Sequence, residues 1–569
     1  MTTHETMPGT QGPTESVAAT DAPALPQVGG NLTTAPPDLV KRFWKYEEAL
    51  MADDLPTLDA LFIDDETTLR ADGAGVLLGS DEIRRFRRGR GGAAQRHIAS
   101  VQAVPVSDTA WLTVGESLTV AGGRGVQTQL WRHDPEQGWR IATAHITGPA
   151  VVLDRSIWRE AGAPLVAPTS SGPLDGMTVA VKDLFAVAGH RIGAGIPEYL
   201  ETAAVEPDHA TAVAHLLANG ASVTGIAQTD QFAYSIAGRN AHYGTPPNPA
   251  RRGSISGGSS SGPASAVALG QVDIGLASDT GGSIRVPASY QGLWGLRTTH
   301  GAVSKNGTLP LAPSFDTIGW ITRDASTLRR AAAASLPENG RHTLPETIEF
   351  VVDRTLVEQS DPDVVEAFDW YLTGLGRGAT EVSLDAGHPS PAQAFPATYY
   401  EAFRVVQAAE AWASHGTWIT EHPDAVIGDV AERFADAALM SRAQHREARE
   451  ILDEARARWE HVLEGRVLLL PSVASVAPES DAPDEHIQAV RTATLAMTCV
   501  AGILGRPALS VPALETKGGP VGLCLVGPQY ADLALVDLGE NIANRQMNQE
   551  HLAARGFGAR EQRTTLTGV

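Results

Sequence analysis

The chain has 569 residues, of which 43% are hydrophobic and 19% charged, and 44 basic against 66 acidic residues give a formal net charge of −22. This composition is typical of a globular protein with a large core, and the length predicts two to four domains or one large domain with an appendage. Nucleic acids and anionic membranes attract basic surfaces, so the acidic balance argues against both as partners.

Residues 1–35 are rich in Thr, Pro, Gly and Ala, and they contain few large apolar residues. This composition predicts a disordered tail. No Lys or Arg precedes Lys41 and no apolar run follows the start, so we expect no secretory signal peptide. The two cysteines, Cys499 and Cys524, lie in apolar runs and do not suggest a disulfide framework. These features predict a cytoplasmic protein.

Residues 36–150 predict a small α+β domain. Leu39, Phe43, Tyr46 and Leu50 recur at helical spacing. Strand-like stretches separated by Gly, Asp and Pro follow, among them TAWLTVGESLTVA and WRIATAHIT. Helices followed by antiparallel strands are typical of an α+β unit.

Four segments of this region, YEEAL, LDALF, GSDEIRRFRRGR and QTQLWRHDPEQGWRIATAHIT, resemble the small SnoaL-like cone domain. More narrowly, they are similar to AtzH-like accessory proteins found beside ureide- and oxalurate-type amidohydrolases. The domain is rich in arginine, which fits either a solvated helix end or an anion pocket, because guanidinium groups match carboxylates. Arg70 and Arg90 are the candidates for such a pocket.

Residues 151–172 are rich in Pro, Gly and Ser, which predicts a linker. From residue 173 to residue 569 the pattern becomes α/β. The apolar run MTVAV ends at Lys182, and further apolar strands alternate with helical stretches and Gly-rich turns. This part is the predicted catalytic domain.

Three residues of the α/β region carry the chemistry. Ser259 follows two glycines in GGSSSG, Ser283 follows two glycines in DTGGSIR, and Lys182 ends an apolar strand upstream. GGSSSG is not a phosphate loop, because no GK[ST] follows, and it is not a linker, because apolar sequence continues on both sides. No G-x-S-x-G elbow surrounds either serine, so an α/β-hydrolase is not indicated.

A serine hydroxyl attacks a carbonyl efficiently only when a base takes its proton. A buried lysine can be that base because desolvation favours the neutral amine, and a second serine can pass the proton between them. Glycines beside Ser283 would let the backbone N–H groups of Thr280, Gly281, Gly282 and Ser283 converge on an oxyanion.

The motifs VAVKDLF, GGSSSG and DTGGSIRVPASYQGLWGLR are similar to the lysine, first-serine and second-serine motifs of the amidase-signature family. The resemblance covers about residues 170–550. It implies the α/β amidase-signature fold, a mixed central sheet covered by helices, preceded here by the small α+β SnoaL-like cone domain. It also implies an amidohydrolase that cleaves the C–N bond of a small carboxamide and releases ammonia or an amine.

The resemblance implies a role for each matching residue. Ser283 would form the acyl-enzyme, Ser259 would bridge from a cis peptide bond after Gly258, and Lys182 would accept and return the proton. Ser260 would support this network. Asp279 and Arg285 flank the Ser283 turn, where we expect a buried ion pair.

The sequence gives two different indications of the substrate. The accessory domain suggests carboxylated ureides or oxalurate-like acids. An aromatic stretch suggests an apolar or aryl acyl group, or else plain helix packing; its candidate pocket residues are Tyr400, Phe403, Trp412 and Trp418. The alternatives are an amidotransferase-type subunit that acts with partners, and a non-catalytic assembly protein.

We expect no cofactor and no metal, because the 17 histidines are scattered without HExxH or similar spacing. The expected partners are a small amide substrate and, from the resemblance alone, a second copy of the chain in a homodimer. Neither nucleic acid nor membrane is expected.

Overall fold

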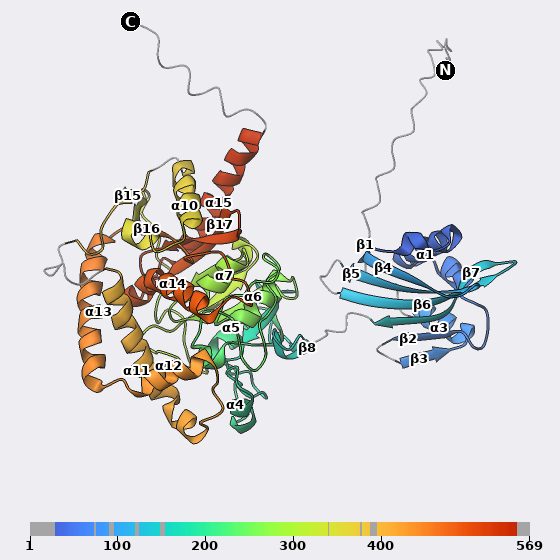
Figure 1. The fold of residues 1–569 in the computed structure, drawn as a ribbon, viewed down its shortest axis with the longest axis horizontal. Coiled ribbons are helices and arrows are strands. Elements are labelled where there is room, and N and C mark those ends of the chain that lie inside the picture. Colours follow the sequence, from blue (N-terminus) through green and yellow to red (C-terminus); the bar gives the residue numbers. More distant parts are fainter. Residues whose placement is uncertain are drawn as a thin grey trace, which may run out of the picture. The chain divides into compact units, whose positions relative to one another are not determined.

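A computed structural model describes residues 29–72, 75–89, 96–119, 124–147, 154–338, 341–375, 378–386 and 395–554. The chain divides into two compact units, Met1–Ala150 and Val151–Val569 (Figure 1). Arg90 and most of the predicted N-terminal tail lie outside the described residues.

The N-terminal unit contains a seven-stranded sheet in the order β1-β4-β5-β6-β7-β2-β3. The described residues of this unit also form the helices η1, α1, α2 and α3, of which α1 and α2 contact β7. The helical pattern of the sequence corresponds to α1, whose residues Leu39, Phe43, Tyr46 and Leu50 are buried. The elements are β1 (Gly29–Gly30), η1 (Leu32–Thr34), α1 (Pro37–Met51), α2 (Leu55–Leu61), β2 (Leu69–Asp72), β3 (Gly75–Leu78), α3 (Ser80–Gly89), β4 (Arg96–Ser107), β5 (Ala110–Thr119), β6 (Arg124–Asp134) and β7 (Gly138–Thr147).

Two boundaries differ from the sequence expectation. The predicted tail reached residue 35, but β1 pairs with β4 and Leu32 is buried, so ordered structure begins by residue 29. The predicted linker 151–172 contains β8 (Trp158–Val166), which pairs antiparallel with β10 (Ser222–Ala227). Because most of its residues are small or polar, this strand at the edge of the sheet was not predicted. Its Trp158 is buried.

The second unit is built on a mixed eleven-stranded sheet in the order β15-β14-β16-β18-β17-β12-β13-β11-β9-β10-β8. The remaining strands are β9 (Thr178–Lys182), β11 (Ile274–Asp279), β12 (Trp294–Arg297), β13 (Thr317–Thr322), β14 (Glu349–Val352), β15 (Thr380–Glu381), β16 (Arg466–Pro471), β17 (Ala508–Thr516) and β18 (Gly519–Val526). Figure 1 shows helices packed around this sheet, as expected for an α/β unit. They are α4 (Pro197–Thr202), α5 (Thr211–Ala218), η2 (Gln231–Ala233), α6 (Ser261–Ala268), α7 (Arg285–Tyr290), α8 (Ala325–Ser335), α9 (Arg354–Val357), α10 (Pro362–Gly374), α11 (Ala397–Glu421), α12 (Asp429–Ala438), α13 (Arg442–Val462), α14 (Asp484–Leu504) and α15 (Asp532–Ala554).

Strand β9 shows why an apolar run precedes the lysine. Val179 and Val181 belong to the large core cluster, while Ala180 between them belongs to a smaller cluster shared with α6. Both faces of this strand are therefore buried, as is typical of a central strand between parallel neighbours. Because side chains alternate along a strand, Lys182 continues the Ala180 face and is directed toward α6.

Helix α14 is the one described helix that is long and apolar enough to cross a membrane, but most of it is buried inside the unit. It packs against α9, α11 and α13. Its apolar surface is accounted for by these contacts and by the core that it shares with the sheet.

Candidate active site

The Lys182 side chain ends among three serine hydroxyls. Its Nζ lies within hydrogen-bond distance of three hydroxyl oxygens, Oγ of Ser259 at 2.8 Å, Ser278 at 2.9 Å and Ser260 at 3.0 Å. The lysine is fully buried, and no carboxylate among the described residues forms an ion pair with it. A neutral amine has two N–H groups and one lone pair, so three hydroxyls, each donor and acceptor, can satisfy it completely.

Burial has the largest effect on the Lys182 amine, and it lowers the pKa from 10.5 to about 7. The carboxylates of Asp230, Asp279 and Asp316 act in the opposite direction but do not offset the loss of water. A lysine with a pKa near 7 is substantially neutral at physiological pH and can therefore accept a proton.

Ser259 lies in the loop before α6 and is held by its backbone. The Gly258–Ser259 peptide bond is cis, as the resemblance implied. The Ser259 carbonyl accepts a hydrogen bond from Thr229 Oγ1 at 2.9 Å. These contacts present its hydroxyl to Lys182 from the side of α6.

Ser283 lies in the turn between β11 and α7, linked to the other serine loop by Ser260 N–H, which donates to the Ser283 carbonyl at 3.3 Å. Gly282 has φ +143°, which favours glycine. The backbone N–H groups of residues 280–283 donate no hydrogen bond within the described part of the chain, nor does the Ser283 hydroxyl. The turn thus presents a hydroxyl and several free amides together. Catalytic hydrogen bonds are often long in unliganded proteins, so the open Ser283 hydroxyl is compatible with a role in proton transfer.

Asp279 holds this turn in position through contacts with two buried arginines. Its carboxylate accepts from Arg285 Nη2 at 2.9 Å and Nε at 3.1 Å, and from Arg297 Nη1 at 3.0 Å, all three residues being inaccessible to solvent. Burial alone would raise the pKa of Asp279, but the two guanidinium groups hold it below its usual range. The ion pair between Asp279 and Arg285 is thus present, and Arg297 was not foreseen.

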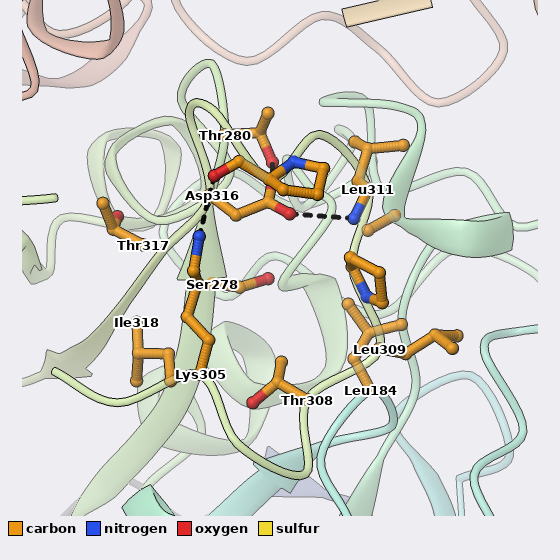
Figure 2. A pocket seen from close by; sticks show the side chains of 13 residues that line it. Leu184, Ser278, Thr280, Lys305, Thr308, Leu309, Leu311, Asp316, Thr317 and Ile318 are labelled. Atoms are coloured by element: carbon orange, nitrogen blue, oxygen red, sulfur yellow. Dashed lines mark hydrogen bonds between the residues drawn. The ribbon is translucent and has the colours of Figure 1, made fainter. Parts of the chain in front are cut away.

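Two cavities adjoin the site, and Ala233 lines both. One lies against Ser278 and Thr280 and extends to Lys305 and Asp316 (Figure 2). In it, Asp316 accepts hydrogen bonds from Thr280 Oγ1 at 2.6 Å and from the Leu311 N–H at 2.9 Å. The other cavity is smaller and is lined by Ser283 and Gly281. Of these two cavities, the second is the one that Ser283 lines.

The four aromatic residues proposed for the pocket lie on α11, but this helix lines the Ser283 cavity through Gln407. Phe403 is fully buried against Phe315, with ring centroids 4.6 Å apart, beneath the Ser283 turn. Trp418 stacks on His422 at 4.3 Å and also packs edge-on against Tyr199. Tyr400 and Trp412 are half-buried. Helix packing therefore accounts for Phe403 and Trp418.

Arg70, the describable candidate for an anion pocket in the N-terminal unit, already has partners. Its Nη1 lies 2.6 Å from Asp72 Oδ2, and its guanidinium lies 4.2 Å from the centroid of the Phe86 ring. This arrangement favours a structural role for Arg70. Nothing in the described residues of this unit points to an anion bound at Arg70.

Sequence reasoning missed two polar groups close to the lysine. Ser278 precedes Asp279 on β11, and its position at a strand end was the available signal. Asp230 is buried, which raises the pKa of its carboxyl to about 6, and its Oδ2 accepts from the Gly238 N–H at 3.0 Å. Among the described residues, no group of three or more His, Cys, Asp or Glu is placed to hold a metal ion.

Comparison with known families assigns the two units. The family named Amidase matches residues 151–536, and the family named AtzH-like matches residues 31–149.

Individual relatives extend this result. Amidase 1 of Arabidopsis thaliana is 34% identical over 402 residues, which cover 66% of this chain and 95% of the relative. A glutamyl-tRNA(Gln) amidotransferase subunit of Natronomonas pharaonis is 31% identical and is covered to 96%. A solved structure described as a vestigial protein complex that reveals the evolutionary origins of an s-triazine catabolic enzyme is 26% identical. It superposes with a TM-score of 0.59 over 66% of this chain and 85% of its own.

Proposed function

Because the chain belongs to the amidase family, fused to an AtzH-like domain, we propose that it hydrolyses small carboxamides through Ser283, Ser259 and Lys182. The family and its amidase relatives make the chain an amidase. The roles of the three residues and the formation of an acyl-enzyme are the proposal.

In the first half-reaction, Ser283 Oγ attacks the amide carbon. Its proton passes to Ser259 Oγ while the Ser259 proton passes to the neutral Lys182 Nζ. The carbonyl oxygen becomes an oxyanion, which the free N–H groups of the turn stabilise, each removed donor costing about 3–4 kcal/mol in comparable enzymes. The C–N bond then breaks as the proton returns through Ser259 to the leaving nitrogen, and ammonia or an amine departs.

In the second half-reaction, water attacks the acyl-enzyme and gives its proton to the same relay. Lys182 is again the acceptor, and the proton finally returns to Ser283 as the carboxylic acid leaves. Asp279 touches no reacting atom; together with Arg285 and Arg297 it holds the turn in position.

One observation carries this proposal: Lys182 is fully buried, and its amine contacts three serine hydroxyls but no carboxylate of the described residues. A lysine with a purely structural role would form an ion pair, because an unpaired buried ammonium group lowers the stability of the fold by several kcal/mol. An amine that is neutral for much of its time avoids that cost and is useful as a base.

The test combines a fluorophosphonate probe, which labels activated serines, with ammonia release from a panel of small amides. We expect Ser283→Ala to lose labelling and to reduce turnover by about 10⁴-fold or more while the urea unfolding midpoint is retained. Ser265→Ala is the matched control, because Ser265 lies within α6 and its hydroxyl donates to the Pro247 carbonyl at 2.8 Å. Near-normal turnover in Ser283→Ala would assign the nucleophile elsewhere.

The second candidate is an amidotransferase-type subunit, which the similarity to the Natronomonas pharaonis protein favours. Such a subunit would act with partners, whereas the amidase proposed here releases ammonia on its own. Ammonia release that required ATP and a second protein would favour this alternative. A homodimer remains a prediction, and light scattering that gave the mass of one 59.9 kDa chain would reject it.

A further inference from the structure

Arg491 lies on α14 and lines the same cavity as Ser283. Its residue is 7% exposed, and its Nε is buried without a hydrogen-bond partner. Within the described part of the chain, no acidic group forms an ion pair with it and no acceptor binds its guanidinium. The other deeply buried arginines near the site, Arg285 and Arg297, both contact Asp279.

A buried guanidinium without an anion is costly, and arginine cannot escape this cost by losing its proton at neutral pH. Burial is the largest influence on Arg491 and lowers its pKa to about 10, which still leaves it charged at neutral pH. The fold therefore keeps a positive charge beside Ser283 that forms no ion pair with any carboxylate of the described residues.

The nearby charged groups are already engaged with one another. Arg433 on α12 pairs with Asp429 at 2.8 Å and donates to the Tyr234 carbonyl at 2.9 Å. Arg404 on α11 pairs with Glu401 at 2.7 Å. Asp429 also acts on Arg491 at longer range, but each acid of these two pairs contacts its own arginine, so within the described residues Arg491 is left without a paired carboxylate.

The cavity wall suits a small acidic molecule. Tyr234, Ser235 and Gln407 supply polar groups, and the side-chain amide of Gln407 has no hydrogen-bond partner among the described residues. Leu495 lies one helical turn after Arg491 and supplies an apolar surface. The cavity is narrow, which favours a short substrate over a bulky one.

We propose that Arg491 binds a carboxylate of the substrate, so that the amides hydrolysed at Ser283 are small acids with the carboxylate a few bonds from the scissile C–N bond. This inference rests on the proposed function of Ser283. A guanidinium binds a carboxylate through two parallel hydrogen bonds, which fixes both the position and the orientation of the substrate. The scissile carbonyl of a short acid would then be held at the Ser283 turn.

The test uses two pairs of amides that differ only at the acid. Malonamate is compared with 3-methylbutanamide and succinamate with 4-methylpentanamide, in which an isopropyl group replaces the carboxylate. The wild-type enzyme should favour the acidic member of at least one pair by about 10-fold or more in kcat/KM. Arg491→Gln should lower kcat/KM for that acid by about 10- to 100-fold, mainly through KM, and change the neutral amide less than threefold.

Arg404→Gln is the matched control, because it removes a neighbouring arginine that has its own acidic partner, and it should change neither substrate more than threefold. Malonate or succinate should slow fluorophosphonate labelling of the wild-type Ser283 but not of Arg491→Gln. The unfolding midpoint of Arg491→Gln should not fall, since the substitution removes an unpaired buried charge.

Three outcomes would overturn the inference while leaving the amidase proposal intact: preference for the neutral amides, equal loss on both members of a pair, or a lower unfolding midpoint in Arg491→Gln. Failure of the proposed function has a different signature. In that case the wild-type Ser283 would not be labelled at all, and no amide of either kind would release ammonia.

Discussion

The titration of Lys182 offers a test that does not require the substrate to be known. The perturbation is pH, and the readout is the rate at which a neutral fluorophosphonate labels Ser283. Only the neutral form of Lys182 can accept the Ser283 proton, so the rate should follow the deprotonated fraction and rise with pH.

The pKa of Lys182, about 7 instead of 10.5, sets how strongly the labelling rate should depend on pH. At pH 8 an amine with a pKa of 7 is about 90% neutral, whereas one with a pKa of 10.5 is about 0.3% neutral, a difference of about 300-fold or roughly 3.4 kcal/mol. We therefore expect labelling to rise about tenfold per pH unit between pH 5 and 6.5 and to level off above pH 8.

Asp230 provides an internal check, because its carboxylate opposes the effect of burial on Lys182. Asp230→Asn removes that negative charge and should shift the profile to lower pH. A wild-type rate that rises only above pH 9.5, or that is flat from pH 5 to 9, would refute the assignment of Lys182 as a neutral base. A profile in Asp230→Asn that moves to higher pH would refute the electrostatic part of the reasoning.

The remaining predictions concern the lysine, the turn and the edge strand. Lys182→Arg should lose labelling as completely as Lys182→Ala, because a guanidinium stays protonated; recovery above one tenth of the wild-type rate contradicts this. Asp279→Asn leaves two buried arginines without a charged partner, so it should lower the free energy of unfolding in urea by about 3–5 kcal/mol. The control Asp537→Asn breaks an exposed ion pair with Arg329 and should lower it by less than about 1 kcal/mol. Gly282→Ala, at φ +143°, should slow labelling about 10- to 100-fold, whereas Gly378→Ala, with open space around it, should not. Trp158→Ala should cost about 3–5 kcal/mol in unfolding, although the residue lies in the predicted linker; no measurable loss would restore the linker interpretation.

Local patterns predicted a large part of the architecture. The apolar run before Lys182, the paired glycines before each serine and the helical spacing from Leu39 to Leu50 are short-range signals, because backbone geometry and one-sided burial dictate them. The α/β fold and the AtzH-like unit followed from motifs that resemble known families. The edge strand β8 was missed because Gly162 and Pro164 interrupt it and because Pro, Gly and Ser residues follow it, so the segment resembled a linker.

The aromatic residues of α11 show a second kind of limit. Phe403 and Trp418 looked equally suited to a pocket and to a core, since both environments favour large apolar side chains. The choice depends on what packs against each of them, which for Phe403 is Phe315 and for Trp418 is Tyr199 and His422. No spacing within α11 could provide that information.

The sequence by itself determined which residues carry reactive groups and where each lies on a strand end or a glycine turn, because these features depend on neighbours along the chain. The tertiary structure decided their environment. It brought Ser278 to the lysine and removed water from Lys182 so that its pKa falls. It also placed Arg491 of α14 beside Ser283, with no ion pair to any carboxylate of the described residues. Desolvation and pairing depend on contacts between segments that are distant in the chain, and only the folded core specifies those contacts.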